Sequence, residues 1–293
     1  MILSIGEILA DMIGGNSSEN LSFNAFCGGA PFNVAVNAKR AGAKVVFLGK
    51  VGDDPIGKFL IEQAKKANFD GLEIQVDPVK NTTLAFVTLT DGERDFAFYR
   101  HDTADYQIDL EECKSFNDKD LSIVHLGSLM LSEKVGVDLA KSVVNKAKKL
   151  GKKISFDINF RLDLYNDFDD AINAYKPFVE QADIIKFSDD ELLAYTGESD
   201  FMKAIEKVSK KDVLLVVTMG SKGSLYYYNE NMKIIPTDVV KPIDTTGAGD
   251  AFFGTLLACL DGKDFNEENL TIAMQKANQA GAKTTQFLGA VEL

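Results

Sequence analysis

Short apolar segments alternate with amphipathic segments along most of the chain. The apolar segments are rich in β-branched residues and have the length of buried parallel strands. They cover residues 1–5, 44–48, 122–126, 153–157, 184–187 and 213–218. Patterns typical of helices lie between most of them, over residues 56–67, 134–150 and 168–182. This alternation predicts an α/β fold with one doubly wound, mostly parallel sheet that is flanked by helices.

Two stretches, residues 11–26 and 72–104, break the alternation. The second contains LAFVTLTDGERDFAFYR, two alternating runs around an Asp91-Gly92 turn, which is typical of a β-hairpin. We therefore expect both stretches to contribute strands to a small antiparallel β lid. The period of two places Phe98 and Arg100 on one face of the hairpin. A ligand-facing strand and a half-buried strand that ends in solvent both fit this pattern.

The composition is that of an ordinary globular protein, with 45% hydrophobic and 26% charged residues in 293. We expect residues 1–293 to form a single domain. The net charge of −12 argues against a broad nucleic-acid-binding surface. The start of the chain lacks a basic segment, and no apolar run is long enough to cross a bilayer, so a cytoplasmic location is predicted. Cys27, Cys113 and Cys259 form no CxxC pair and are expected to be reduced, with Cys259 in the core.

The first motif that indicates a catalytic or binding site lies near the end of the chain. IDTTGAGDAFFG at residues 243–254 runs into AFFGTLLACL (251–260), a segment apolar enough to be a buried helix. The first turn of such a helix directs amide groups and a positive dipole end at an anion, and glycines allow its close approach. Asp250 would lie in that turn as an ionised proton acceptor. Phe252 excludes the dinucleotide motif, and the residues after Gly254 exclude a P-loop. An aspartate cap after a tight turn is the alternative.

Polar clusters also follow other predicted strands. They are DINFR at 157–161, KFSDDE at 186–191 and TMGSKG at 218–223. Ligands of open α/β sheets bind beyond the carboxyl ends of the strands, which is where these clusters fall. CGGAPFNVA at 27–35 joins a glycine pair to a small-residue helix, which suits either close packing on a ligand or a simple helix start with proline. The clusters together predict one binding site.

These motifs give the chain a specific resemblance. GGAPFNVAV, KVGDDPIG, FYR, DINFR, SDDE, TMGSKG and above all DTTGAGDAFFG are similar to the motifs of the ribokinase-type (PfkB) carbohydrate kinases, and most similar to those of fructokinases. The resemblance covers nearly the whole chain. It implies a ribokinase-like fold and an enzyme that uses ATP and Mg²⁺ to convert fructose to fructose 6-phosphate. It also implies that K⁺ is a candidate ion and that a homodimer could form through the lid.

The resemblance implies roles for individual residues. Asp250 would be the general base, and the backbone of Gly247, Ala248 and Gly249 would form the anion hole. Arg161 would face the phosphoryl group or a charged end of the substrate. The residues implied to bind the sugar are Asp11, Gly28, Gly29, Asn33, Phe98 and Arg100.

The same resemblance implies a nucleotide site and two ion sites. The residues implied to border ATP, in addition to Gly247 and Gly249, are Lys186, Ser188, Thr218, Gly220, Gly223 and Asn278. Glu191 would hold Mg²⁺ through water, and Asp244 and Thr246 would bind a monovalent cation. Ser188 stands where the general family pattern has Asn, which is similar to fructokinases.

Two alternatives stay open at this stage. A kinase for an acidic sugar such as 2-keto-3-deoxygluconate, or for another small sugar, fits because Arg100 and Arg161 could pair with a carboxylate. A catalytically silent sugar- or nucleotide-binding regulator of the same fold is the alternative from a different class. The joint presence of Asp250, Gly247, Gly249 and Arg161 argues against it.

Overall fold

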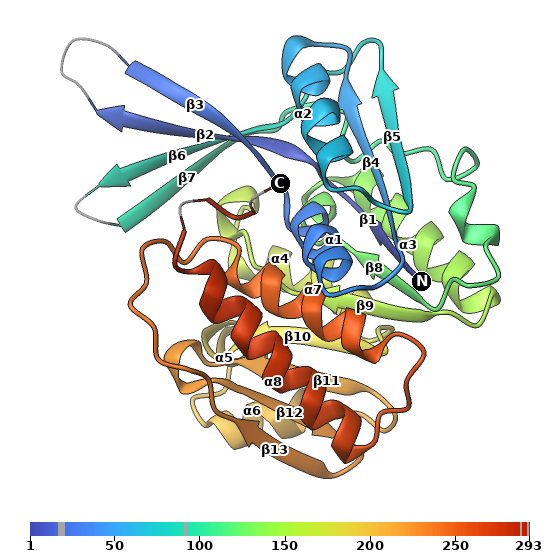
Figure 1. Ribbon diagram of the computed structural model, residues 1–293, viewed down its shortest axis with the longest axis vertical. Helices are drawn as coiled ribbons and strands as arrows, with labels where there is room; N and C mark the ends of the chain where they lie inside the picture. The colour runs from blue at the N-terminus through green and yellow to red at the C-terminus, as the bar shows by residue number, and fades with distance from the viewer. Residues whose placement is uncertain (17–20, 91–92, 288, 292) are drawn as a thin grey trace.

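The computed structural model describes residues 1–16, 21–90, 93–287, 289–291 and 293 (Figure 1). Its centre is a nine-stranded sheet. The strands in spatial order are β13 (Asn231–Ile235), β12 (Ser224–Tyr228), β11 (Leu214–Thr218), β10 (Ile184–Ser188), β9 (Lys153–Asp157), β8 (Ile123–Leu126), β1 (Ile2–Ile5), β4 (Val45–Gly52) and β5 (Gly71–Asp77). All neighbours are parallel except for the antiparallel pairs β11–β12 and β12–β13. The predicted mostly parallel sheet is confirmed.

A second, four-stranded sheet projects from one end of the main sheet (Figure 1). This lid sheet has the order β3 (Leu21–Gly28), β2 (Leu9–Asn16), β6 (Leu84–Thr90) and β7 (Glu93–Tyr99). The pair β6–β7 is antiparallel, as the hairpin pattern predicts, and β2–β3 is antiparallel too. β2 and β6 run parallel, so the lid sheet is mixed and not wholly antiparallel as expected. The Asp91-Gly92 turn lies outside the described residues. The lid prediction for residues 72–104 was too broad, because β5 belongs to the main sheet, where Leu72 and Ile74 pack against the core.

Helices cover both faces of the main sheet. One face carries α1 (Ala30–Arg40), α2 (Pro55–Lys66), α7 (Ala248–Leu260) and α8 (Glu267–Thr284). The other carries α3 (Lys134–Lys149), α4 (Phe168–Val179), α5 (Asp189–Thr196) and α6 (Phe201–Val208). Short 3₁₀ turns lie at Ser115–Asn117, Leu129–Ser132, Leu162–Leu164 and Gly220–Lys222. Side chains of central strands alternate between the two cores, as Ile2 and Leu3 of β1 do, so the middle of the sheet is buried on both faces.

Polar caps fix where several helices begin. The Asp54 carboxylate accepts the amide of Gly57 at 2.7 Å before α2, and Asp167 does the same for Asp170 at 2.8 Å before α4. Such a cap satisfies an amide that has no partner within the helix. Among the described residues, no helix combines the length and apolarity needed to cross a bilayer.

The helix α7 is buried between α1 and α8, as its apolar sequence predicts (Figure 1). A side chain at Gly254 would place its Cβ 2.3 Å from the carbonyl oxygen of Val34, so glycine is needed for the close approach of α1. Cys259 on the same helix was predicted to be in the core but is only partly buried, unlike Cys27 and Cys113. This packing directs the first turn of α7 toward the carboxyl ends of the central strands.

Candidate active site

The start of α7 is fixed by the segments on either side of it. Asp244 is buried, and its two carboxylate oxygens accept the amides of Thr246 and Gly289, each at 2.8 Å. Gly247 caps the helix with φ 75°, and a Cβ there would lie 2.4 Å from the carbonyl oxygen of Ala290. Only glycine fits this turn without strain. The first amides of a helix have no partner within it, so this end can hold an anion.

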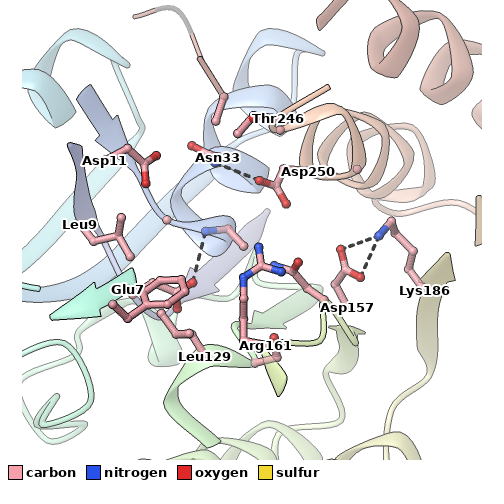
Figure 2. Close-up of a pocket in the computed structure, with 18 of the residues that line it drawn as sticks. Glu7, Leu9, Asp11, Asn33, Leu129, Asp157, Arg161, Lys186, Thr246 and Asp250 are labelled. Atoms are coloured by element: carbon pink, nitrogen blue, oxygen red, sulfur yellow. Dashed lines mark hydrogen bonds and ion pairs between the residues drawn. The ribbon is translucent and has the colours of Figure 1, made fainter. Parts of the chain in front are cut away.

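A cavity of about 370 Å³ opens on one side of this turn (Figure 2). The main sheet, α1, the lid sheet and the start of α7 all contribute to its wall. The predicted residues that line it are Asp11, Gly29, Asn33, Phe98, Arg161, Lys186, Thr246, Gly247, Gly249 and Asp250. Residues to which the sequence analysis gave no individual role complete the wall. Ala30, Asp157, Asn159 and Thr245 belong to motifs that were expected at the site, whereas Glu7, Leu9, Ser128, Leu129 and Ala290 do not.

Asp250 projects into this cavity from the first turn of α7. Its Oδ2 accepts a hydrogen bond from the Nδ2 of Asn33 at 2.9 Å, which fixes the orientation of the carboxylate. Burial raises the pKa of Asp250 above its ordinary value, while the bond from Asn33 and the charges of Lys186 and Arg161 oppose the rise. A carboxylate with a raised pKa is a better proton acceptor, and one held in place can act as a general base.

A buried ion pair lies beside Asp250. The Nζ of Lys186 contacts both carboxylate oxygens of Asp157 at 2.8 Å, and each residue is only 5% exposed. Burial alone would lower the pKa of Lys186, but the nearby carboxylates, Asp157 first, raise it, so the lysine stays charged. A Cβ at Gly249 would lie 3.3 Å from the Nζ, so the lysine rests against the start of α7. It adds a positive charge where a bound anion would lie.

Arg161 is placed by the connection that follows β9. Its Nη1 donates to the carbonyl of Phe160 at 3.0 Å, and Figure 2 shows its guanidinium in the middle of the cavity. The amide of Phe160 in turn donates to Glu191 at 3.0 Å. The other oxygen of Glu191 accepts the amide of Ser188 at 2.7 Å, in a capping box that begins α5. Glu191 and Ser188 thus support the Arg161 segment and do not line the cavity.

A second cavity of about 290 Å³ lies on the opposite side of the same helix start. Five of its lining residues are implied by the family resemblance to border ATP, namely Thr218, Gly220, Gly223, Gly249 and Asn278. Asn278 is buried, and its Nδ2 donates to the carbonyls of Ile235 at 2.9 Å and Pro236 at 3.2 Å. The cavity is mainly apolar, with Val240, Pro242 and Phe252 among its other lining residues, and therefore suits a planar ring.

The two cavities share Thr245 and Gly249. A molecule in the first cavity and a second molecule in the other would therefore meet at the anion-binding turn of α7. Asp250 stands on the first side of that turn, within the cavity that carries the polar side chains. This arrangement can transfer an anionic group from one ligand to the other.

Two residues predicted to bind the sugar lie behind the cavity wall. Arg100 is 5% exposed, and its Nε and Nη2 donate to Asp105 at 2.9 and 2.7 Å, while its Nη1 donates to Ser132 at 2.6 Å. The Asp105 carboxylate neutralises the charge of Arg100 there, so this guanidinium does not face the cavity as predicted. Gly28 allows Asp11 to approach, since a Cβ at position 28 would lie 2.1 Å from Asp11 Oδ2.

The sequence analysis missed several lining residues. Glu7 comes directly after β1, and Ser128 and Leu129 follow β8, so the strand-end rule could have found them. Ala290 has no recognisable signal, because its role depends on a tertiary contact with Gly247. No cluster of three or more His, Cys, Asp or Glu side chains that could hold a metal occurs within the described part of the chain.

Comparison with known proteins gives one consistent result. Residues 1–292 match the model of the pfkB family of carbohydrate kinases. The chain is 37% identical to a probable fructokinase-5 of Arabidopsis thaliana over 302 residues, which cover 99% of this chain and 93% of the relative. It also resembles the fructokinase of Xylella fastidiosa with bound ATP, with TM-score 0.87 and 30% identity over 99% of this chain and 93% of that one. The chain also resembles the fructokinase of Vibrio cholerae O395 with bound fructose, ADP and calcium, with TM-score 0.88 and 31% identity over 99% of this chain and 94% of that one.

Proposed function

The chain belongs to the pfkB family of carbohydrate kinases and is an ATP-dependent sugar kinase, and on that premise we propose that it phosphorylates the primary hydroxyl of fructose. The product would be fructose 6-phosphate. The observation that carries this proposal is the pair of cavities that meet at the start of α7, with Asp250 on the polar side. The related structures that contain fructose with ADP, or ATP, support the two ligands.

We assign the polar cavity to the sugar. Asp11 accepts hydrogen bonds from sugar hydroxyls, Asn33 and the backbone at Gly29 complete this wall, and Phe98 covers the sugar from the lid. Gly28 leaves the space that the Asp11 carboxylate occupies. We assign the apolar cavity to the nucleotide, with Thr218, Gly220, Gly223 and Asn278 around it. The terminal phosphate then lies at the turn that both cavities share.

Transfer requires a deprotonated hydroxyl and a stabilised phosphoryl group. The Asp250 carboxylate takes the proton of the primary hydroxyl as its oxygen attacks the γ-phosphorus. A new oxygen–phosphorus bond forms while the bond to the bridging β–γ oxygen breaks, and ADP leaves. The amides at Gly247–Gly249, together with Arg161 and Lys186, balance the negative charge that spreads over the transferring group.

The residues around Glu191 fit a magnesium ion held through water. Each of its oxygens accepts one backbone amide and keeps a further lone pair, so a water ligand can bridge to the ion. Mg²⁺ bound to ATP supplies charge neutralisation of the phosphates. Asp244 and Thr246 fit a monovalent-cation site beside the helix start, where Asp244 is buried, and K⁺ is the candidate.

The charges of the cavity favour a neutral sugar over an acidic one. Arg100 is paired with Asp105 behind the wall, and Lys186 is paired with Asp157, so Arg161 is the one of the two candidate arginines that lines the cavity and could meet a substrate carboxylate. An acidic sugar would also face the carboxylates of Asp11 and Asp250, and such contacts cost several kcal/mol.

We expect turnover of fructose to exceed that of 2-keto-3-deoxygluconate by at least about tenfold in kcat/KM. A coupled assay of ADP release over a panel of sugars, with and without Mg²⁺, measures this directly. Equal or higher turnover of the acidic sugar would reject fructose as the substrate. An absence of sugar-dependent ADP release across the panel would instead favour a silent binding regulator.

We propose that the lid sheet closes on the bound sugar and excludes water, which otherwise competes as the acceptor. Phe98 on β7 and Asp11 on β2 both face the sugar cavity, so sugar contacts link the lid to the main domain. The sheet edges at β3 and β7 are also the surface through which a homodimer would form.

Closure predicts slower hydrogen exchange in β6 and β7 when the sugar is added. The expected result is protection of amides in β6 and β7, with α3, which lines neither cavity, as the internal reference. Unchanged exchange in the hairpin at saturating sugar would contradict closure.

A further inference from the structure

A buried ion pair at the root of the lid has no role in the proposed reaction. β6 and β7 pair as far as Leu84 and Tyr99, so Arg100 directly follows the last pair of the hairpin. Arg100 and its partner Asp105 are 5% and 1% exposed. Buried charges are rare and costly unless they are paired and hydrogen-bonded, so this pair calls for an explanation.

The Asp105 carboxylate joins the two strands of the hairpin where they leave the main domain. Its Oδ2 accepts the Nε and Nη2 of Arg100, which follows β7, at 2.9 and 2.7 Å. Its Oδ1 accepts the hydroxyl of Thr83, which precedes β6, at 2.6 Å, and that of Thr103 at 2.7 Å. The Cζ of Arg100 also lies 4.7 Å from the centre of the Tyr106 ring. All five residues are buried, so water does not compete for these contacts.

The remaining nitrogen of the guanidinium links this root to the wall of the polar cavity. Arg100 Nη1 donates to the Oγ of Ser132 at 2.6 Å, and that hydroxyl donates to the carbonyl of Leu129 at 3.1 Å. Leu129 lines the cavity and packs with Leu9 in a small apolar cluster, against which Phe98 of β7 rests. Arg100 therefore connects the strand that carries Phe98 to the turn that carries Leu129.

Arginine is suited to this double contact. Its planar guanidinium meets one carboxylate with two nitrogens and still directs a third nitrogen to another acceptor. Lysine has a single charged nitrogen on a flexible stem and does not reproduce this geometry. Both ends of the link are fixed, since Asp105 is held by two threonine hydroxyls and Ser132 ends a 3₁₀ turn.

We propose that Arg100 is a positioning residue for the sugar, which acts through Phe98 by fixing the root of β7 to the 3₁₀ turn Leu129–Ser132. This inference rests on the proposed sugar-kinase function. Arg100 itself does not line the polar cavity, so its effect reaches the ligand through the aromatic ring. Its loss should weaken sugar binding and leave the transfer step intact, because Asp250 and Arg161 stay in place.

Two substitutions break the link to different extents. Arg100→Met removes the bonds to both Asp105 and Ser132, whereas Ser132→Ala removes only the bond to the 3₁₀ turn. We expect the sugar KM to rise about 5- to 20-fold in Arg100→Met and about 2- to 5-fold in Ser132→Ala. In both variants, kcat and the ATP KM should stay within about threefold of the wild type. The coupled ADP assay measures these constants with the panel sugar that the wild type turns over fastest.

Ile205→Ala is the matched control for a general loss of stability. Ile205 is fully buried on α6, which lines neither cavity, so its truncation leaves a void in a distant part of the core. This variant should have a lower Tm and a sugar KM within about twofold of the wild type. If Arg100 had only a structural role, Arg100→Met would show the same behaviour.

A double-mutant cycle tests whether Arg100 acts through Phe98. Phe98→Ala alone should raise the sugar KM about tenfold. Once the ring is absent, its position no longer matters, so adding Arg100→Met should raise the KM little beyond the larger single effect. Independent roles, including a direct contact of Arg100 with the sugar, would multiply to about 100-fold.

The proposal is supported by a rise in the sugar KM alone, found in both Arg100→Met and Ser132→Ala and lost in the Phe98→Ala background. An unchanged sugar KM, an equal rise in the ATP KM, or multiplied effects in the double variant would overturn it while the kinase function stands. If Arg100→Met does not fold, Ser132→Ala with and without Phe98→Ala decides. No turnover of any sugar by the wild type would overturn the kinase function, and this proposal with it.

Discussion

Asp250→Asn will lower kcat for fructose phosphorylation by about 10²- to 10⁴-fold, the range for the loss of a general base. The substitution keeps the size of the side chain and its contact with Asn33, which lies 2.9 Å away, so the sugar and ATP sites should remain intact. Steady-state kinetics with a coupled ADP assay measures the change, and ATP binding should be nearly unaffected.

The pH dependence provides a second readout for Asp250. The pKa of this group is raised in the protein, so wild-type kcat should fall as the pH drops through that pKa and the carboxylate takes up a proton. The residual activity of Asp250→Asn should lack this acidic limb. Asp264→Asn, on an exposed loop, is the matched control and should behave as the wild type. Full activity in Asp250→Asn would show that another group is the base.

Lys186→Met will destabilise the protein by about 3–5 kcal/mol and lower kcat by about 10²-fold. The substitution leaves the Asp157 carboxylate buried without its cation, which is the costly way to break such a pair. It also removes a positive charge from the turn where the terminal phosphate is expected. The loss of one group that stabilises transition-state charge typically lowers the rate by about 10²-fold or more. Urea unfolding measures the first effect and the ADP assay the second.

A double variant separates the two effects of Lys186. Asp157→Asn combined with Lys186→Met removes both charges, so most of the lost stability should return. The rate of phosphoryl transfer should stay low, because the cation beside Gly249 is still missing. Recovery of both stability and wild-type kcat would show that Lys186 serves only to neutralise Asp157.

Much of the fold follows from local patterns. The strands β1, β8, β9, β10 and β11 lie where short β-branched segments predict them, because a buried parallel strand needs apolar side chains on both faces. The turn before α7 was also predicted, because a glycine-rich segment in front of an apolar helix has few other conformations available to it. These features are determined by residues that are close together in the sequence, so local sequence patterns are enough to predict them.

Other features depend on contacts between distant segments. β5 was assigned to the lid because its residues belong to the stretch that breaks the alternation of strands and helices, yet its pairing partner is β4. Arg100 was expected to face the sugar, but Asp105 and Ser132 bind it inside the protein. The antiparallel strands β12 and β13 were not predicted either. β13 forms the edge of the sheet and is largely exposed, so its sequence carries a weak apolar signal.

The site likewise combines features that local sequence patterns predict with features that depend on contacts between distant segments. The Asn33 contact with Asp250 spans 217 residues, and the contact of Lys186 with Asp157 joins two strands. Sequence motifs identified most of the residues but not these pairings, which set the charge and orientation of the groups. Glu7 carried only the weak signal of a polar residue after a strand, and its unpartnered oxygen becomes visible in three dimensions.

The central claim is that a phosphoryl group passes from nucleotide to sugar at the start of α7. A crystal structure of the complex with fructose and a non-hydrolysable ATP analogue tests it most directly. We predict that the primary hydroxyl lies within about 3 Å of the Asp250 carboxylate, and that the terminal phosphate contacts the amides of Gly247–Gly249. A terminal phosphate bound elsewhere, or a sugar with no hydroxyl near Asp250, would contradict the account.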